Sequence, residues 1–300
     1  MALRRRILVT GASGTVGRAV VSGLHDMGAA VRALTRDPGS ARLPDGVDAV
    51  RGDLSVPATL EAGLDGVEAV FLTWPLLTAK AAPAFLRVAA NHARRIVYLS
   101  SLSVRDGRGR QADPISAVHA EMERLIGQSG LEWTFLRSSG FAANTLLWAG
   151  QIRAGDVVRW GHGAARRSLI HEGDIAAVAA HALTRDGHSA KTYLLTGPEA
   201  LTQVEQVYVI GEVIGRPLRY QEIPPKAAQQ RLLTAWGLPP VAARLLPARS
   251  RARRIADGAL GSWATMVDEP EPVTPTVHEV TGAPARTFRE WATDHAGDFL

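Results

Sequence analysis

Short apolar runs alternate with longer amphipathic segments over the first half of the chain. The runs are four to six residues long and predict strands at Arg6–Thr10, Ala30–Thr35, Asp48–Arg51, Ala69–Thr73, Arg95–Ser100 and Trp133–Leu136. Helices are predicted between them, near Gly17–Met27, Ala58–Leu64, Ala79–Ala93 and Ser116–Ser129. This alternation predicts an α/β fold, a doubly wound parallel sheet with helices on both faces. Right-handed crossovers favour the strand order 3-2-1-4-5-6.

The pattern changes after Asn144, where glycine and arginine become frequent. A helix capped by Asp174 and one further strand then predict a return to the sheet. The other elements predicted in this half are the strand Thr192–Thr196, the helix Thr202–Val213 with a Thr202/Glu205 capping box, and the helix Thr287–His295. We therefore predict a sheet domain over residues 1–150, completed by 174–197, and a smaller, mainly helical lobe over 151–300.

A glycine-rich turn follows the first predicted strand. The run Ile-Leu-Val leads directly into Gly-x-x-Gly-x-x-Gly, with glycines at positions 11, 14 and 17, and a helix follows. In the dinucleotide-binding unit of Rossmann folds, the first glycine permits a tight turn, the second lets backbone approach a pyrophosphate, and the third lets the helix pack on the strand. The helix N-terminus offers free N–H groups to the phosphates. The turn therefore predicts a nucleotide site.

The end of the second strand distinguishes the two nicotinamide dinucleotides. NAD sites place an acidic residue there for the ribose 2′-hydroxyl, whereas NADP sites place an arginine for the 2′-phosphate. This chain has Thr35 at the strand tip and Arg36 immediately after it, with Asp37 as the competing acid. Since a guanidinium can hold a phosphate through two hydrogen bonds, we favour NADP(H) over NAD(H). A solvent-exposed loop arginine is the alternative interpretation of Arg36.

Two further strand ends carry candidate cofactor contacts. Asp53 and Leu54 follow the third strand, where they could accept from the adenine amino group and cover its ring; a simple helix cap before Pro57 is the alternative. Thr73 and Trp74 end the fourth strand, near the expected ribose and pyrophosphate. We interpret Trp74 as a pocket wall, with ordinary core packing as the alternative.

Composition excludes several function classes. The chain has no cysteine, which rules out disulfides, thiolate metal ligands and a catalytic thiol, and we predict no metal site. Its net charge is +5, almost entirely from arginine, yet no nucleic-acid-binding motif accompanies the arginine clusters, so no nucleic acid is expected. No apolar run approaches the ~20 residues of a membrane span, and no signal peptide precedes the first strand. We expect a soluble cytoplasmic protein without a membrane partner.

Taken together, the motifs GASGTVGR, VRALTRDP, RGDL, VFLTWP and RIVYLSSLSV resemble the NmrA-like family of atypical short-chain dehydrogenases/reductases. The similarity continues through LEWTFLRSSGFAANTL, DIAAVAAHAL, YLLTGPEALT and TGAPARTFREWATDH. It implies an NADP-preferring Rossmann domain with a substrate cleft under a C-terminal lobe. It also implies pyrophosphate contacts from Gly11, Ser13, Gly14, Thr15, Val16 and Gly17, a 2′-phosphate contact from Arg36, and a nicotinamide flanked by Ser100, Ser101 and the segment from Ser138 through Ser139 and Gly140 to Phe141.

One departure concerns the chemistry. Typical reductases of this superfamily carry Tyr-x-x-x-Lys on the helix after the fifth strand, where this chain has Ile115 and His119. We consider His119 as the substitute proton donor, oriented by Glu123 one helical turn later, with a surface helix pair as the alternative. Ser103 is expected to orient a substrate oxygen, and Asn144 and Trp148 are expected to line the cleft, although packing is equally plausible for the tryptophan. His162 and His171 fall in the segment that covers the nicotinamide, where His171 is expected to cap or pack beside Asp174.

These features favour an NADP(H)-dependent oxidoreductase acting on a small, apolar, aromatic or quinone-like molecule. Such an acceptor takes a hydride without needing a protein nucleophile. The missing Tyr-x-x-x-Lys pair leaves two alternatives: a non-catalytic NADP(H) sensor that binds a protein partner, and a natural-product tailoring enzyme of another reaction type. A homodimer is a further expectation.

Overall fold

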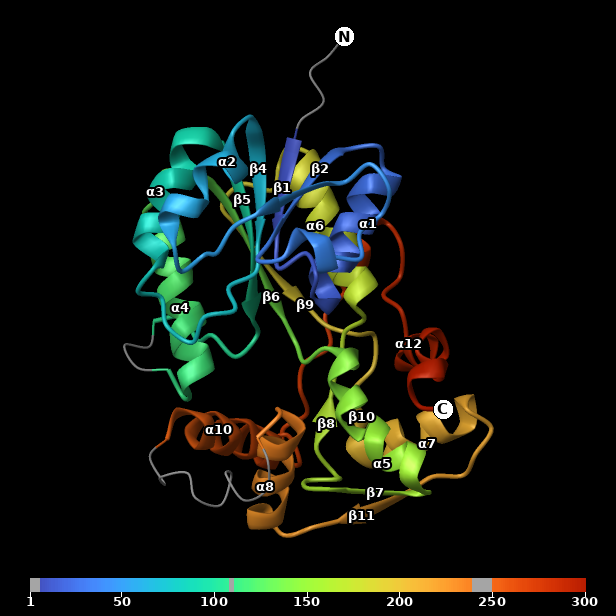
Figure 1. The fold of residues 1–300 in the computed structure, drawn as a ribbon. Helices are drawn as coiled ribbons and strands as arrows, with labels where there is room; N and C mark the ends of the chain where they lie inside the picture. The colour runs from blue at the N-terminus through green and yellow to red at the C-terminus, as the bar shows by residue number, and fades with distance from the viewer. Residues whose placement is uncertain (1–5, 108–110, 239–249) are drawn as a thin grey trace.

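The computed structural model describes residues 6–107, 111–238 and 250–300, which form a sheet domain and a smaller lobe (Figure 1). Seven parallel strands make the central sheet in the order β3-β2-β1-β4-β5-β6-β9. They are β1 (Arg6–Thr10), β2 (Ala30–Thr35), β3 (Asp48–Arg51), β4 (Val67–Leu72), β5 (Arg95–Ser101), β6 (Glu132–Ser138) and β9 (Lys191–Leu195). The sequence-based strand order and the added final strand are confirmed.

Helices cover both faces of this sheet. Along β1 the side chains alternate, so that Ile7 and Val9 face one core and Leu8 faces the other. The first core is closed by α1 (Thr15–Asp26) and α6 (Glu172–Thr184), and the second by α2 (Glu61–Leu64), α3 (Ala82–His92) and α4 (Pro114–Gly127). Two short 3₁₀ turns, η1 (Pro38–Ser40) and η2 (Pro57–Thr59), follow β2 and β3.

The lobe lies beyond the carboxyl ends of the strands (Figure 1). Its elements are η3 (Ala142–Trp148), α5 (Ala149–Ala154), β7 (Val157–Trp160), β8 (Arg166–Arg167), β10 (Leu201–Thr202), α7 (Gln203–Val213), β11 (Arg219–Glu222), α8 (Pro225–Ala235), α10 (Arg251–Thr265), α12 (Phe288–Asp294) and η4 (Ala296–Asp298). Two small sheets, β10-β8 and β11-β7, brace it. A third core, built around buried residues such as Trp160 and Trp291, holds these elements together.

The structure differs from the sequence-based prediction at three points. Helix α6 begins at Glu172 and is capped by the His171 side chain, not by Asp174. Ala142 and Trp148 already belong to the lobe core, so the packing boundary precedes residue 151. Helix α11 (Thr276–Thr281) returns to the sheet domain, where Val277 joins the core beneath α6. The predicted capping box of α7 is confirmed, and α12 begins with a second one, formed by Thr287 and Glu290, that was not predicted. No helix within residues 6–107, 111–238 and 250–300 has the length and apolarity needed to cross a membrane.

Candidate functional site

The glycine turn after β1 is built as its spacing predicts. Gly11 has φ +61°, in the left-handed region that favours glycine, and a Cβ there would overlap Thr73. A Cβ on Gly17 would overlap the carbonyl group of Gly11, so α1 approaches the turn this closely only with glycine at that position. The Gly14 N–H donates to the Gly11 carbonyl at 2.9 Å and closes the turn.

This turn presents the N-terminus of α1 to solvent. Gly14 is the N-cap, and no side chain bonds the first free N–H groups of the helix. Ser13 and Gly14 are exposed and Thr15 is half-buried, whereas the Val16 side chain lies in the core and leaves only its backbone for a ligand. An exposed helix N-terminus behind a glycine turn fits a pyrophosphate.

Thr73 braces the turn from the neighbouring strand end. Its hydroxyl donates to the Thr10 carbonyl at 2.7 Å, and its N–H donates to the Thr10 hydroxyl at 2.9 Å. These bonds join the carboxyl ends of β1 and β4 where the glycine turn begins. The observed role of the Thr73 side chain is therefore to hold the turn in place.

The two charged residues after β2 differ in their contacts with the rest of the described chain. Arg36 is exposed and has no hydrogen bond or ion pair to any described residue. The Asp37 carboxylate instead accepts the Gly39 N–H at 3.2 Å and caps η1. Asp53 is also engaged locally: it accepts the Ser55 hydroxyl at 2.6 Å and the Ser55 N–H at 2.8 Å. These bonds, with a smaller contribution from the Arg36 charge, lower the pKa of the Asp53 carboxyl.

Two apolar candidates near this edge are core residues. Trp74 is 8% exposed, packs against Phe85, and donates its indole N–H to the Thr78 carbonyl at 2.9 Å. The ring has a core position and its polar atom has a partner, which favours the core-packing alternative, and a contact of Trp74 with the cofactor stays a prediction. Leu54 lies in the same core. Its role in covering the adenine stays a prediction and concerns only the small part of the side chain that is exposed.

The structure turns His119 away from the expected reaction centre. Its Nδ1 lies 2.7 Å from the hydroxyl of Tyr98, a fully buried β5 residue. Burial lowers the pKa of His119 to about 4, against the opposing effect of Glu123 and Asp113, and burial also raises the pKa of the Tyr98 phenol. The imidazole is therefore neutral at pH 7 and holds no proton of an imidazolium acid. This geometry favours a structural role for His119, and its role as proton donor stays a prediction.

Glu123 does not orient His119 either. Its carboxylate accepts the Ser100 hydroxyl at 2.5 Å and pairs with Arg137 of β6 at 2.7 Å. The other side of the Arg137 guanidinium holds Asp106 at 2.6 Å. This network joins β5, α4 and β6 just below the sheet edge, and it takes the Ser100 hydroxyl out of the candidate site.

A chain of hydroxyl groups does reach the end of β5. The Ser101 and Ser103 hydroxyls lie 2.7 Å apart, the Ser103 and Ser116 hydroxyls lie 2.8 Å apart, and the Ser116 hydroxyl donates to the Asp113 carboxylate. Asp113 in turn caps α4 by accepting the Ile115 and Ser116 N–H groups. The sequence did not reveal this carboxylate, since its link to Ser103 passes through Ser116. The chain supplies an ordered polar group near the expected nicotinamide.

The segment after β6 runs along the entrance to the lobe. Ser139 donates its hydroxyl to the Ser168 carbonyl at 2.6 Å, and the Ile170 N–H donates to the Gly140 carbonyl at 2.9 Å. Phe141 forms a bridge with Ile170. The segment therefore lies beside residues 168–170, immediately after β8, and its contact with the nicotinamide stays a prediction.

Other residues proposed for the substrate side fall in different surroundings. Asn144 is exposed, whereas Trp148 is 3% exposed and packs edge-on against Trp160 in the lobe core, so its role as a cleft residue is wrong. His162 lies in a lobe turn whose N–H donates to Glu222. His171 caps α6 through Nδ1 and faces Asp294 at 3.2 Å, which confirms the structural interpretation.

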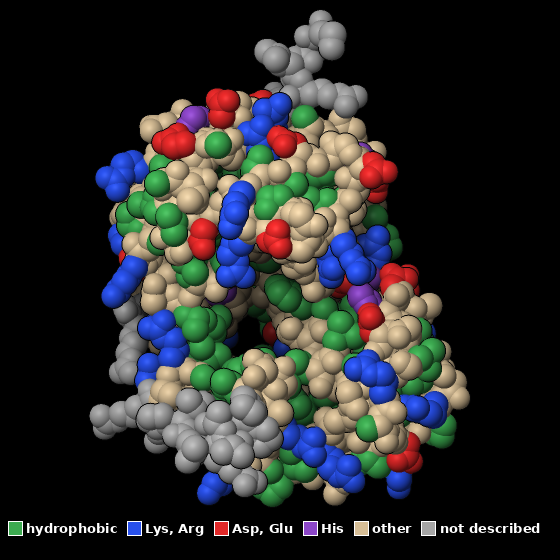
Figure 2. All heavy atoms as spheres, in the orientation of Figure 1, with side chains coloured by type: hydrophobic (Ala, Val, Ile, Leu, Met, Phe, Trp, Pro, Cys, Tyr) green, Lys and Arg blue, Asp and Glu red, His purple; other side chains and the backbone are tan. Residues whose placement is uncertain are grey.

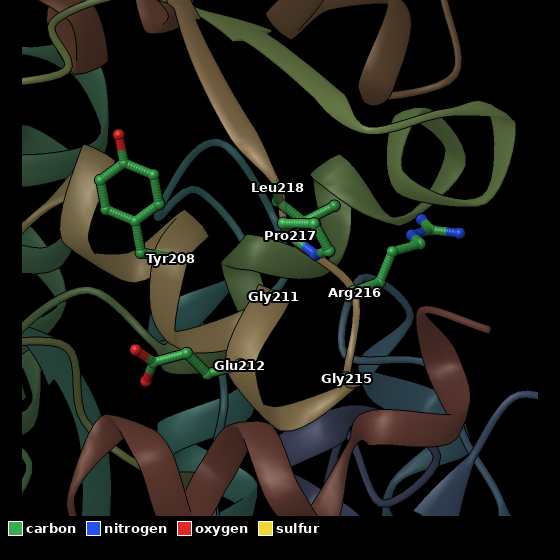
Figure 3. A pocket seen from close by; sticks show the side chains of 7 residues that line it. All are labelled: Tyr208, Gly211, Glu212, Gly215, Arg216, Pro217 and Leu218. Carbon is green, nitrogen blue, oxygen red and sulfur yellow. The ribbon is translucent and has the colours of Figure 1, made fainter.

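The molecule is hollowed between the sheet domain and the lobe, at the carboxyl edge of the sheet (Figure 2). A separate pocket lies within the lobe, between α7 and β11, and is lined by Tyr208, Gly211, Glu212, Gly215, Arg216, Pro217 and Leu218 (Figure 3). The Arg216 guanidinium is already bonded to backbone carbonyls of α5 and its C-terminal turn. The hollow between the two parts, next to the glycine turn, is where a doubly wound sheet binds its ligands.

Comparison with known proteins agrees with this geometry. Residues 11–186 match the NAD(P)H-binding family model. The chain belongs to this family. It is 40% identical over 298 residues to a (4-alkanoyl-5-oxo-2,5-dihydrofuran-3-yl)methyl phosphate reductase of Streptomyces griseus subsp. griseus, covering 98% of this chain and 99% of the relative. It is 35% identical over 299 residues to an NAD(P)H azoreductase of Xenophilus azovorans, covering 98% and 99%.

Among solved structures, an NADPH-dependent quinone oxidoreductase of Escherichia coli complexed with NADPH shares the fold, with a TM-score of 0.75 and 22% identity over 96% of this chain and 99% of that one. The fold and the curated relatives identify the chain as an NAD(P)H-dependent reductase of the atypical short-chain dehydrogenase/reductase group. The family resemblance inferred from the motifs is therefore confirmed.

Proposed function

We propose that this reductase uses NADPH in preference to NADH. The observation that carries the proposal is the pair of side chains after β2: Arg36 is exposed and has no hydrogen-bond or ion-pair partner among the described residues, while the Asp37 carboxylate is occupied by the Gly39 N–H. A free guanidinium suits the 2′-phosphate, and an acid tied to its own turn is a poor acceptor for a ribose hydroxyl. The remaining cofactor contacts proposed are the glycine turn, the end of β5 and the segment Ser139, Gly140 and Phe141.

The substrate proposed is a small, apolar, conjugated molecule such as a quinone. Bound NADPH supplies a hydride. A quinone accepts that hydride and takes one proton from water, which yields the hydroquinone and hydroxide, so no strong protein acid is required. This chemistry suits a site in which His119 is neutral and faces Tyr98. The names of similar reductases also describe conjugated acceptors, namely an azo compound, a quinone and an oxo-dihydrofuran.

The protein's own contribution is binding and orientation. The lobe covers the carboxyl edge of the sheet and limits access of water to the reacting atoms. The hydroxyls of Ser101 and Ser103, held by Ser116 and Asp113, are proposed to hydrogen-bond an oxygen of the substrate, and the one that donates exchanges its bond within the serine chain for the bond to the substrate. Positioning of this kind accelerates hydride transfer without a covalent intermediate.

Steady-state assays with the purified chain test the proposal. We expect NADPH oxidation with naphthoquinone and related quinones, and little with simple aliphatic ketones, whose reduced oxygen needs a stronger acid. Isothermal titration calorimetry measures the binding of NADPH in parallel. Binding of NADPH without turnover of any quinone or azo acceptor would contradict the substrate proposal and favour the sensor alternative.

A further inference from the structure

Arg167, at the entrance to the lobe, is a charged side chain with no hydrogen-bond or ion-pair partner among the described residues. Its Nε is buried without an acceptor from this part of the chain. The nearest acid is Glu271, whose carboxylate accepts the Ser168 N–H at 3.0 Å and contacts the Ser168 hydroxyl at 3.4 Å. Burial lowers the pKa of Arg167, against the opposing charge of Glu271, although an arginine remains charged at neutral pH.

An unpaired guanidinium in such a place is energetically unfavourable. Buried polar groups in folded proteins are nearly always hydrogen-bonded, and a buried charge is normally paired. Arg167 still retains some solvent contact, so its free N–H groups face an accessible space. We therefore expect a ligand to supply the hydrogen-bond acceptor that the described residues do not offer to this guanidinium.

Two neighbouring residues fix the position of the Arg167 guanidinium and leave its hydrogen-bond donors unused. Its guanidinium carbon lies 5.4 Å from the centre of the Trp263 ring of α10, a cation–π contact that fixes the side chain without using its hydrogen-bond donors. On the other side it lies directly against Gly140, where any Cβ would overlap the Nη2 atom. Glycine at this position therefore makes room for the guanidinium.

This arrangement belongs to the proposed substrate side of the site. Gly140 lies in the segment after β6 that is proposed to flank the nicotinamide, and β8 is tied to that segment through Ser139 and Ser168. Trp263 is half-buried and packs against the buried Trp160, so its accessible part offers an aromatic surface beside the guanidinium. An apolar ring with an attached anion would satisfy both features at once.

We propose that Arg167, held on Trp263, binds an oxyanion group, a phosphate or sulfonate, carried by the conjugated substrate. The proposal rests on the proposed reductase function, because it places the anion on the molecule that is reduced. The planar guanidinium matches the geometry of two oxyanion oxygens, and Trp263 supplies the neighbouring apolar contact.

Binding of naphthyl phosphate to the protein saturated with NADP⁺ tests the site without turnover. By calorimetry, we expect the wild-type chain to bind naphthyl phosphate more tightly than naphthol. Arg167→Met should weaken naphthyl phosphate binding by roughly tenfold to a hundredfold and leave naphthol unchanged. Arg167→Lys keeps the charge but loses the two-pronged geometry, so an intermediate loss is expected.

Arg166→Met is the matched control, since Arg166 is the neighbouring, exposed residue of the same strand. It should leave naphthyl phosphate affinity unchanged. Equal affinity in Arg167→Met and wild type, or an equal loss in Arg166→Met, would overturn the assignment. A loss confined to NADP⁺ affinity in Arg167→Met would instead assign the guanidinium to the cofactor and also overturn it.

Turnover distinguishes this inference from the function on which it rests. With naphthoquinone and its sulfonate as acceptors, Arg167→Met should lower kcat/KM for the sulfonate alone. If the wild type reduces neither quinone but binds naphthyl phosphate through Arg167, the anion site stands and the proposed reaction fails. If both quinones are reduced equally well by wild type and Arg167→Met, the reaction stands and the anion site fails.

Discussion

At the scale of single residues, free and engaged side chains separate ligand contacts from structural ones. Arg36 and Arg167 have no partner among the described residues, whereas Asp37, Asp53 and Trp74 are bonded within the protein. A residue already bonded must break that bond before it can hold a ligand, so the free arginines are the stronger candidates. His119 is likewise engaged, because its Nδ1 is bonded to the Tyr98 hydroxyl.

The NADPH preference belongs to this scale. Arg36→Ala should raise the Kd for NADPH by roughly tenfold to a hundredfold, the cost of one guanidinium–phosphate interaction, and leave the Kd for NADH unchanged. Fluorescence titration with both dinucleotides measures the effect. Arg87→Ala, an exposed arginine on α3, serves as the control and should change neither value. An equal loss of both dinucleotides in Arg36→Ala would remove the basis for the preference.

At the scale of elements, a buried ionic network sets the position of α4 against the sheet. Glu123 of α4 bonds Ser100 of β5 and Arg137 of β6, and the side chains of Glu123 and Arg137 are 8% and 9% exposed. The network lies immediately behind the strand ends that carry Ser101 and Ser138. It therefore fixes the edge of the sheet against which the nicotinamide is proposed to lie.

Glu123→Ala should lower the free energy of unfolding by about 3 kcal/mol, because it leaves the Arg137 guanidinium buried with only Asp106 as partner. Denaturant unfolding measures the change. Glu121→Ala on the same helix removes an exposed pair with Arg124 and should cost less than about 0.5 kcal/mol. Similar losses in the two variants would show that the network adds no more than a surface pair.

At the scale of the whole molecule, two units with separate cores enclose the hollow between them (Figure 2). The chain crosses between the units after β6 and again around β8, and α11 returns from the lobe side to pack beneath α6. Additional ties join α6 to the C-terminal segment: Asp174 pairs with Arg286, and Glu172 accepts the Trp291 indole N–H at 3.1 Å. These ties place the last helices of the chain against the sheet domain.

Global stability should fall in acid because of His119. Its pKa is about 4 in the folded chain against an ordinary value of 6.5, so the unfolded chain binds the extra proton between these values. Stability is therefore fully present above pH 6.5 and is lost as the pH falls towards 4, by up to about 3 kcal/mol. Denaturant unfolding from pH 7 to pH 4 measures this, and His119→Gln should show a shallower slope. Parallel slopes would contradict the assigned burial of a neutral imidazole.

The amino-acid sequence by itself determined the strand order, the glycine turn and the capping box of α7. These features depend on residues close together in the chain, whose spacing has a direct geometric consequence. The positions of Arg36 and Asp37 at a strand end could be predicted for the same reason. The absence of the Tyr-x-x-x-Lys pair follows from the sequence, but the contacts of His119, which replaces its lysine, do not.

Only the tertiary structure decided which side chains are free to act. His119 meets Tyr98 from β5, Trp148 meets Trp160 from β7, and Arg167 meets Trp263 from α10. Each pair joins residues distant in the chain, and their contact depends on how helices and strands pack, which periodicity does not specify. The sheet could be predicted because its pattern is local, whereas the substrate side of the cleft is made where separate elements meet.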